Sequence, residues 1–307
     1  MMTIPMSEPD ITRAERAAVL EVLRSPTLSI GPRLELFERA LASYVGTRHA
    51  VGISNGTAGL HLAMIAAGVG EGDTVLTTPF SFVASANCAL YVGARPEFVD
   101  IEPLSLTIDP GLLAEAAERL ARAGRPAKAI VPVHVFGQPA DMDPICALAK
   151  RHHMAVVEDA CEAIGARYRG RAVGRLGDAG VFAFYPNKQM TTGEGGMLVT
   201  DNAEWAALFR SLRNQGRDVF DGWLAHTRLG YNYRLDELSA ALGAVQIMRL
   251  EEILDKRERV AEWYSERLIG IEGVQLPTVA SWTTRLSWFV YGVRIEGAGE
   301  RDRLIAE

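Results

Sequence analysis

The feature that most constrains the fold is an alternation of short apolar runs with helical patterns between residues 48 and 200. The runs are apolar along their whole length, which is typical of strands buried on both faces of a parallel sheet. We expect strands at 50–53, 74–77, 96–99, 129–133, 154–158, 179–184 and 197–200. Helical patterns separate them at 57–67, 83–91, 111–123 and 145–152, and another follows at 203–212. The sequence therefore predicts an α/β fold with a mostly parallel central sheet and helices on both faces.

The pattern changes after residue 234. Residues 236–268 form one long amphipathic stretch rich in Arg and Glu, which predicts a single helix. Residues 288–295 read as a strand of a smaller C-terminal α/β domain, and 300–307 as the start of a helix. We expect a large domain at 1–245 with an N-terminal arm at 1–32. Residues 246–307 would then begin a small domain that is incomplete, since one strand and a helix start do not make a domain.

Charge and composition exclude several classes of protein. The net charge is −6 and no basic patch is present, so we expect no nucleic-acid partner. No apolar run is long enough to span a bilayer, and the N-terminus lacks the basic start and apolar core of a signal peptide. The three cysteines, Cys88, Cys146 and Cys161, are an odd number without metal-binding spacing. We therefore expect a cytoplasmic protein with reduced thiols, no membrane contact and no metal site.

Lys188 is one of only four lysines in the chain. It follows the apolar run 179–184 and precedes a glycine-rich turn at 193–196. An amine held at a strand end by irregular backbone suits a nucleophile that forms a Schiff base. The alternative, a surface lysine in a loop, is the commoner case for an arbitrary lysine.

Residues 54–60 (SNGTAGL) lie between a predicted strand and a predicted helix. Gly56 and Thr57 would open that helix, where unpaired backbone N–H groups can bind a phosphate. A capped turn without a ligand explains the same pattern equally well. A second glycine string, at 68–72, follows a helix and precedes a strand, which is the wrong order for a dinucleotide-binding loop. A nicotinamide-dependent dehydrogenase is therefore disfavoured.

Three further side chains lie near predicted strand ends. Asp159 ends the apolar run 154–158, where a carboxylate could hold a proton on a heteroaromatic nitrogen or could simply cap the next turn. Glu162 could face the same place or complete a capping box. Phe82 could stack on a flat cofactor or belong to the core. A phosphate cradle, an aromatic ring, a carboxylate and a lysine at the ends of strands in one sheet are together what pyridoxal phosphate requires.

Five segments carry a family resemblance: SNGTA at 54–58, PVHVFG at 132–137, EDA at 158–160, GEGG at 193–196 and GYNYR at 230–234. By these the chain resembles, along nearly its whole length, the DegT/StrS sugar-aminotransferase family, whose members are fold-type I pyridoxal-phosphate enzymes. The resemblance implies the following roles: Lys188 forms the aldimine, Asp159 pairs with the pyridine nitrogen, Phe82 stacks on the ring, and Gly56 and Thr57 bind the phosphate. It also implies a homodimer with shared active sites, in which Asn232 reaches the neighbouring subunit's phosphate.

The function implied by the resemblance is transamination in amino sugar and polysaccharide biosynthesis. An amino group would pass from glutamate to the keto group of a nucleotide-linked deoxy sugar, through a Lys188 aldimine and a pyridoxamine intermediate. A sibling subgroup that removes oxygen from sugars has histidine in place of this lysine, so Lys188 favours transamination. A keto-cyclitol as the acceptor is one alternative. A second is a cofactor-binding protein without activity, either regulatory or truncated.

The sequence departs from the family pattern at three places. Ala183 stands where many relatives have a phosphate-binding serine, and Glu162 stands where glutamine or histidine is common. A carboxylate beside the cofactor's phenolic oxygen would be repulsive unless it is protonated or paired. The family also usually continues several tens of residues past residue 307, so we expect the small domain to be incomplete.

Substrate contacts are less sharply indicated. The segment 25–32, which contains Ser29, resembles the family's N-terminal loop near the sugar. Arg234 could bind a substrate carboxylate or phosphate, or could pair with Asp236 or Glu237. His134 is close to the strand ends, and we expect it to be a hydrogen-bonded core residue.

Overall fold

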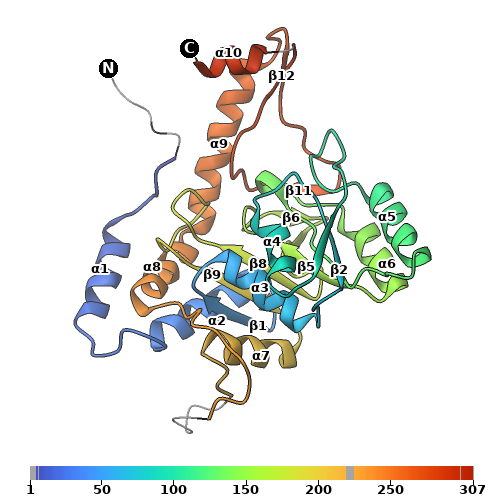
Figure 1. The fold of residues 1–307 in the computed structure, drawn as a ribbon. Coiled ribbons are helices and arrows are strands. Elements are labelled where there is room, and N and C mark those ends of the chain that lie inside the picture. The colour runs from blue at the N-terminus through green and yellow to red at the C-terminus, as the bar shows by residue number, and fades with distance from the viewer. Residues whose placement is uncertain (1–4, 6, 219–224, 298, 307) are drawn as a thin grey trace.

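The centre of the molecule is a seven-stranded sheet with the strand order β1-β9-β8-β5-β4-β2-β3 (Figure 1). The computed structural model describes residues 5, 7–218, 225–297 and 299–306. All strands of this sheet run parallel except β9, which is antiparallel to both of its neighbours. The mostly parallel sheet that the sequence predicts is therefore confirmed. The strands are β1 (His49–Ile53), β2 (Thr74–Thr77), β3 (Arg95–Phe98), β4 (Ala129–Ile130), β5 (Ala155–Asp159), β8 (Ala179–Ala183) and β9 (Gly196–Thr200).

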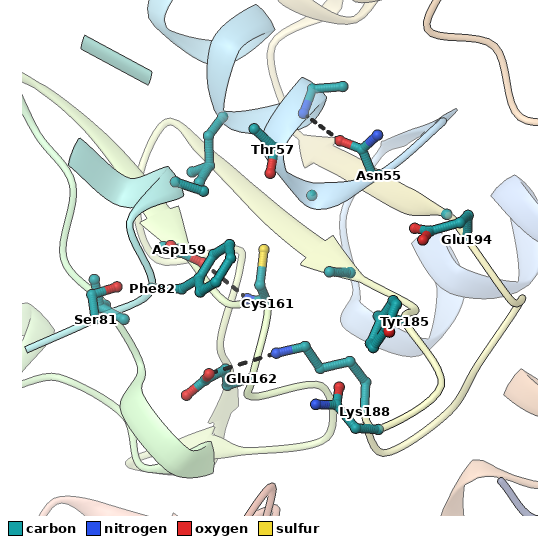
Figure 2. A pocket seen from close by; sticks show the side chains of 18 of the residues that line it. Asn55, Thr57, Ser81, Phe82, Asp159, Cys161, Glu162, Tyr185, Lys188 and Glu194 are labelled. Carbon is teal, nitrogen blue, oxygen red and sulfur yellow. Dashed lines mark hydrogen bonds and ion pairs between the residues drawn. The ribbon is translucent and has the colours of Figure 1, made fainter. Parts of the chain in front are cut away.

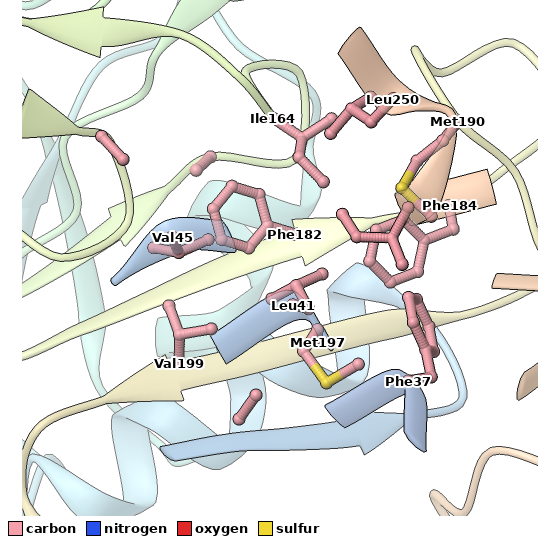
Figure 3. Close-up of a cluster of buried hydrophobic side chains, with 14 of the residues drawn as sticks. Phe37, Leu41, Val45, Ile164, Phe182, Phe184, Met190, Met197, Val199 and Leu250 are labelled. Atoms are coloured by element: carbon pink, nitrogen blue, oxygen red, sulfur yellow. The ribbon is translucent and has the colours of Figure 1, made fainter. Parts of the chain in front are cut away.

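Helices cover both faces of the sheet, as predicted. Successive residues of β8 point to opposite faces. Val181 packs in the cluster beneath α3 and α7. Phe182 packs in the cluster with α2 and α8, which Figure 3 shows. One face carries α3 (Gly56–Ala66), α4 (Ala84–Leu90) and α7 (Ala203–Arg213). The other carries α2 (Pro32–Val45), α5 (Pro110–Arg122), α6 (Met142–His152) and α8 (Glu237–Met248).

Helix α3 packs unusually close to the sheet, and a glycine makes this possible. A Cβ atom on Gly59 would lie 2.6 Å from side-chain atoms of both Ile53 and Val181, a distance that real Cβ contacts do not reach. Glycine therefore lets the helix backbone rest directly on β1 and β8. As a result, the N-terminus of α3 lies beside the carboxyl ends of the parallel strands, where open α/β sheets bind ligands.

The single helix predicted at 236–268 is wrong. The chain forms α8 and then α9 (Leu250–Leu268), with a break at Arg249, whose φ and ψ are −102° and 3°. The Arg249 guanidinium binds Asp10 and Glu15, which connects this break to the segment leading into α1 (Arg13–Leu23). A tertiary contact thus interrupts a stretch whose local propensity is helical throughout.

The strand predicted at 288–295 is also mostly wrong. Only β12 (Arg294–Ile295) pairs in a ladder, with β10 (Val274–Gln275). Trp288 has a positive φ of 47°, and Arg257 binds the carbonyl groups of both Trp288 and Phe289, which leaves them unable to pair with a strand.

Several short elements have no counterpart in the sequence prediction. They are β10, a small antiparallel sheet of β6 (Arg167–Tyr168), β7 (Arg171–Ala172) and β11 (Thr283–Arg285), and the 3-10 turn η1 (Val135–Gly137). The helix start predicted at 300–307 corresponds to α10 (Glu300–Ala306). The division into domains at residue 245 falls inside α8 and stays a prediction. Within the described ranges, no helix combines the length and apolar character needed to cross a bilayer.

Candidate active site

A cavity of about 740 Å³ lies where α3 and α4 begin, beside the ends of β5 and β8 (Figure 2). Six of the residues singled out from the sequence line it together: Gly56, Thr57, Phe82, Asp159, Glu162 and Lys188. The remaining lining residues are Asn55, Ala58, Leu60, Ser81, Ala84, Tyr91, Val133, Cys161, Ala183, Tyr185, Asn187, Glu194, Gly195, Tyr233 and Phe289.

The start of α3 forms a cradle for an anion. Asn55 caps the helix by accepting the N–H of Ala58 at 2.8 Å, and the first N–H groups of a helix have no partner within it. A Cβ atom on Gly56 would lie 2.7 Å from the Cys161 sulfur and 2.9 Å from the Ala183 Cβ, so a larger residue would block the cradle. Ala183 borders this place but offers no hydroxyl. Backbone N–H groups and the Thr57 hydroxyl are what the cavity presents to a phosphate.

Asp159 is nearly buried, at 5% exposure, and both of its oxygens are held by protein donors. Its Oδ2 accepts the Ser85 hydroxyl at 2.5 Å, and its Oδ1 accepts the Cys161 N–H at 3.2 Å. The Ser85 hydroxyl also contacts the Ser81 hydroxyl, with 2.6 Å between the two oxygens. Neither serine was predicted from the sequence, although their i,i+4 spacing at the start of a helix indicates that they share a face.

Phe82 lies between these two serines along the chain and lines the cavity. Its ring is 70% exposed, which rules out the alternative that it belongs to the core of this chain. A ring that stands free beside a cavity can pack against a flat ligand.

Lys188 is 14% exposed at its side chain, so it is not an ordinary surface lysine. Its Nζ lies 3.5 Å from Glu162 Oε1 and 4.0 Å from the centre of the Phe289 ring. The Lys188 N–H donates to Tyr185 O at 2.9 Å, and the Lys188 carbonyl accepts a hydrogen bond from Arg257 at 2.8 Å. Backbone and side chain are therefore both fixed, with the amine directed into the cavity.

Glu162 is the counter-ion of Lys188. Its other oxygen, Oε2, accepts the N–H of Phe136 at 3.0 Å, where the backbone has a positive φ of 56°. Burial raises the pKa of Glu162, and the nearby Lys188 ammonium opposes that shift only in part. A carboxyl group that takes a proton easily can lie beside a phenolic oxygen without the repulsion expected of a permanent charge.

Arg257 is a third residue of the site that was not predicted from the sequence, because it belongs to a charged run on α9 that reads as a solvated face. Its guanidinium donates to the carbonyl groups of Lys188, Trp288 and Phe289, at 2.8, 3.0 and 3.2 Å. Burial lowers the pKa of Arg257. This side chain ties the turn that carries Lys188 to the segment that carries the Phe289 ring.

Three predicted site residues do not line the cavity of their own chain. Ser29 and Asn232 are exposed, and Arg234 donates to Asn214 Oδ1 at 3.1 Å rather than pairing with Asp236 or Glu237. Their roles toward a substrate or a neighbouring subunit stay predictions.

His134 is the hydrogen-bonded core residue that the sequence predicts. Its side chain is fully buried, with Nε2 2.8 Å from Glu158 Oε2. Its Nδ1 accepts the N–H of Ala140 at 3.0 Å. Because Nδ1 accepts, Nε2 carries the hydrogen and donates it to Glu158. Both polar atoms of the ring are thus used within the protein.

The residues around the cavity fit pyridoxal phosphate. The α3 cradle suits a phosphate, Phe82 offers a free ring, Asp159 keeps an open side toward the cavity, and Lys188 presents an amine. Such a set can bind the cofactor, fix its ring and supply both a nucleophile and a proton carrier.

Comparisons with known proteins agree with this assignment. A model described as the DegT/DnrJ/EryC1/StrS aminotransferase family matches residues 9–307. The GDP-perosamine synthase of Caulobacter vibrioides is 42% identical over 308 residues, covering 99% of this chain and 81% of that protein. The spore coat polysaccharide biosynthesis protein SpsC of Bacillus subtilis is 38% identical over 302 residues, with coverages of 95% and 76%. The crystal structure of S. venezuelae DesV with a ketimine intermediate has a TM-score of 0.88 and 38% identity, covering 95% of this chain and 76% of that chain.

Proposed function

The chain belongs to the DegT/DnrJ/EryC1/StrS aminotransferase family, and from this we propose that it moves an amino group from glutamate to the keto group of a nucleotide-linked deoxy sugar. Membership confirms the predicted fold type, the pyridoxal phosphate cofactor and the assignment as a sugar-type aminotransferase. Glutamate as the donor, and a nucleotide-linked deoxy sugar as the acceptor, are the parts that we propose.

The observation that carries the proposal is the placement of a nearly buried lysine in the same cavity as a carboxylate and a helix N-terminus. When bound, pyridoxal phosphate supplies an electron sink and a carrier for the amino group. A lysine is needed in addition because its amine both holds the cofactor and moves a proton between carbon atoms. Relatives named for perosamine and spore coat polysaccharide synthesis support a sugar as the acceptor.

We assign the following roles to the side chains of the cavity. Lys188 Nζ would hold the cofactor through its aldehyde carbon and would carry the proton. Asp159 would accept the N–H of the pyridine ring, and Phe82 would cover one face of that ring. Gly56 and Thr57 would hold the phosphate through the start of α3. Glu162, whose pKa is raised by burial, keeps Lys188 in place and would be the carboxyl group nearest the phenolic oxygen.

A homodimer with shared active sites belongs to the same proposal. Asn232 is exposed and does not line the cavity of its own chain, so it is available to contact the cavity of a second copy. Large apolar side chains are also exposed around the start and end of α4: Phe80, Phe82, Val83, Leu90 and Tyr91. An apolar group of this kind beside a cavity is typical of a surface that a partner covers. An Asn232→Ala variant should weaken cofactor binding without changing the fold, and sedimentation should give a dimer.

The test is a pair of half-reactions followed by absorbance. Glutamate added to the cofactor-loaded protein should remove the visible band of the lysine-linked cofactor and release 2-oxoglutarate. A keto sugar nucleotide should then restore the band and yield an amino sugar. If only a keto-cyclitol restored the band, the amino acceptor would be a keto-cyclitol and not a sugar nucleotide. A loaded protein that responds to no donor and no ketone would support the binding protein without activity.

A further inference from the structure

We infer that Ser81 and Ser85 form a chain of hydrogen bonds that fixes the orientation of the Asp159 carboxylate. In this chain, which we call the hydroxyl relay, Ser81 donates to Ser85 and Ser85 donates to Asp159. Ser85 is then the residue that positions Asp159, and Ser81 offers a hydrogen-bond acceptor to the cavity. The inference rests on the proposed function, because it gives Asp159 its task of holding the pyridine N–H. It adds two residues that sequence reasoning did not reach.

The contacts fix the direction of the relay. An ionised carboxylate only accepts hydrogen bonds, so the 2.5 Å contact between Ser85 Oγ and Asp159 Oδ2 uses the single hydrogen of Ser85. Ser85 must then accept from Ser81 across their 2.6 Å contact, which uses the hydrogen of Ser81. Ser85 is 1% exposed and its hydroxyl has these two partners, so the order runs from Ser81 through Ser85 to Asp159.

The relay makes Asp159 a rigid acceptor. Ser85 holds one carboxylate oxygen and the Cys161 N–H holds the other, at 3.2 Å, so rotation of the carboxylate would break two hydrogen bonds. Each oxygen of a carboxylate can accept more than one hydrogen bond, which leaves capacity for a ring N–H on the open side. Hydrogen bonds to a charged oxygen are also about twice as strong as those between neutral groups.

The same turn of chain also carries the stacking ring. Phe82 lies one residue after Ser81 and three before Ser85, in the segment that opens α4. One turn of backbone therefore sets both the face of the cofactor ring, through Phe82, and the orientation of Asp159, through Ser85. A shift of this turn would change both contacts together.

The Ser81 end of the relay favours ligand groups that donate a hydrogen bond. Ser81 lines the cavity and its hydroxyl hydrogen points to Ser85, so toward a ligand its oxygen offers only lone pairs. A ligand group placed there must be a donor, such as a sugar hydroxyl or an ammonium, because a carboxylate or phosphate oxygen would find no hydrogen.

The experiment is a double-mutant cycle that measures the dissociation constant for pyridoxal phosphate. Ser85→Ala should weaken binding roughly tenfold, as expected for a lost hydrogen bond to a charged group. In an Asp159→Asn background the same change should have less than about a twofold effect, since the charged acceptor is gone. Ser85→Thr keeps the hydroxyl and should restore most of the affinity. Ser105→Ala is the matched control, because Ser105 is also buried and bonded to a hydroxyl, that of Thr107, but lies outside the cavity.

Equal losses from Ser85→Ala in both backgrounds would overturn the inference, because they would mean that Ser85 acts on the fold and not through Asp159. A loss from Ser81→Ala as large as that from Ser85→Ala would overturn the order of the relay, which predicts a smaller loss at its outer end. If Asp159→Asn itself left the affinity and the visible band unchanged, the proposed role of Asp159 would fail first, and the relay with it.

Discussion

Two buried clusters of polar side chains lie on opposite faces of β5, and they differ in where their hydrogen bonds go. Consecutive residues of a strand point to opposite faces, so Glu158 and Asp159 belong to different clusters. We call the first the closed cluster: Glu158, His134 and the backbone N–H groups of Gly174, Leu176 and Gly177. Every contact of Glu158 in it is with the protein, at 2.6–2.8 Å.

The second we call the open cluster: Asp159, Glu162, Lys188 and Ser85. Its carboxylates also accept hydrogen bonds from the protein, through Ser85, Cys161 and Phe136. Asp159, Glu162 and Lys188 nevertheless line the cavity and keep bonding capacity directed into it.

Burial of a charged group therefore does not by itself mark a functional site. Glu158 is more buried than Asp159, yet its hydrogen bonds saturate it and leave nothing for a ligand. Buried polar groups are normally paired within the protein, so capacity left open toward a cavity is the informative feature. The closed cluster should therefore govern stability, and the open cluster should govern chemistry.

Lys188→Ala should give the largest effect on activity. We propose that its amine holds the cofactor and moves the proton, so we expect kcat to fall by at least about 10³-fold without it. The melting temperature should change by only a few degrees, because the lysine belongs to the open cluster. Lys150→Ala, at the exposed end of α6, is the control and should change neither quantity. A Lys188→Ala enzyme with near-normal turnover would contradict the claim that the open cluster governs chemistry.

Glu158→Gln should give the largest effect on stability. Glutamine keeps only one acceptor oxygen, so its NH2 group must face one of two pairs of donors: His134 with the N–H of Gly174, or the N–H groups of Leu176 and Gly177. Each buried donor left without an acceptor costs about 1–3 kcal/mol, and denaturant unfolding would measure the loss. Cofactor affinity of the folded fraction should stay within a few-fold of the wild-type value. A stable Glu158→Gln protein that had lost cofactor binding would reverse the assignment of the two clusters.

Glu15 is another carboxylate whose hydrogen bonds are made within the protein, and it predicts how stability depends on acid pH. Burial opposes its ionisation, but hydrogen bonds from Thr12, Arg249 and Gln246 outweigh this and lower the pKa of Glu15 to about 2 from its ordinary value of 4.5. Its contribution to stability is therefore complete above pH 4.5 and is lost as the pH falls toward 2. Glu15→Gln should cost about 2 kcal/mol at neutral pH. That difference should shrink as unfolding is measured at lower pH, and a difference that grew in acid would contradict the assignment.

Glu162→Gln should give the smallest change in stability and the opposite dependence on pH. Burial raises the pKa of Glu162, so its favourable contribution is present below the unfolded pKa and is lost as the pH rises through the folded pKa. In the cofactor-free protein the glutamine should therefore match or exceed the wild type at neutral pH, by less than about 1 kcal/mol. A loss of several kcal/mol would place Glu162 in the closed cluster.

The sequence predicted the sheet, the helices on both faces and the six cavity residues because these depend on local pattern and on strand ends. Apolar runs identify buried strands, and the carboxyl ends of parallel strands meet at one edge. Asp159 and Lys188 could be placed together for that reason.

What the sequence could not predict depends on contacts between distant segments. The break at Arg249 is held by Asp10 and Glu15, more than 230 residues away along the chain. Arg257 reads as part of a charged helical face but turns inward to the carbonyl group of Lys188. Three of the hydrogen bonds to Glu158 come from backbone N–H groups of the loop at 174–177. No local sequence pattern predicts that this loop packs against Glu158.

The role of Lys188 is tested most directly by finding which lysine the cofactor attaches to. Pyridoxal phosphate bound to the protein would be reduced with borohydride, and the peptides would be examined by mass spectrometry. The chain has four lysines, Lys128, Lys150, Lys188 and Lys256, so the result is unambiguous. We predict the reduced cofactor on Lys188 alone. Attachment to any of the other three, or no attachment to a protein shown to be folded, would contradict the account.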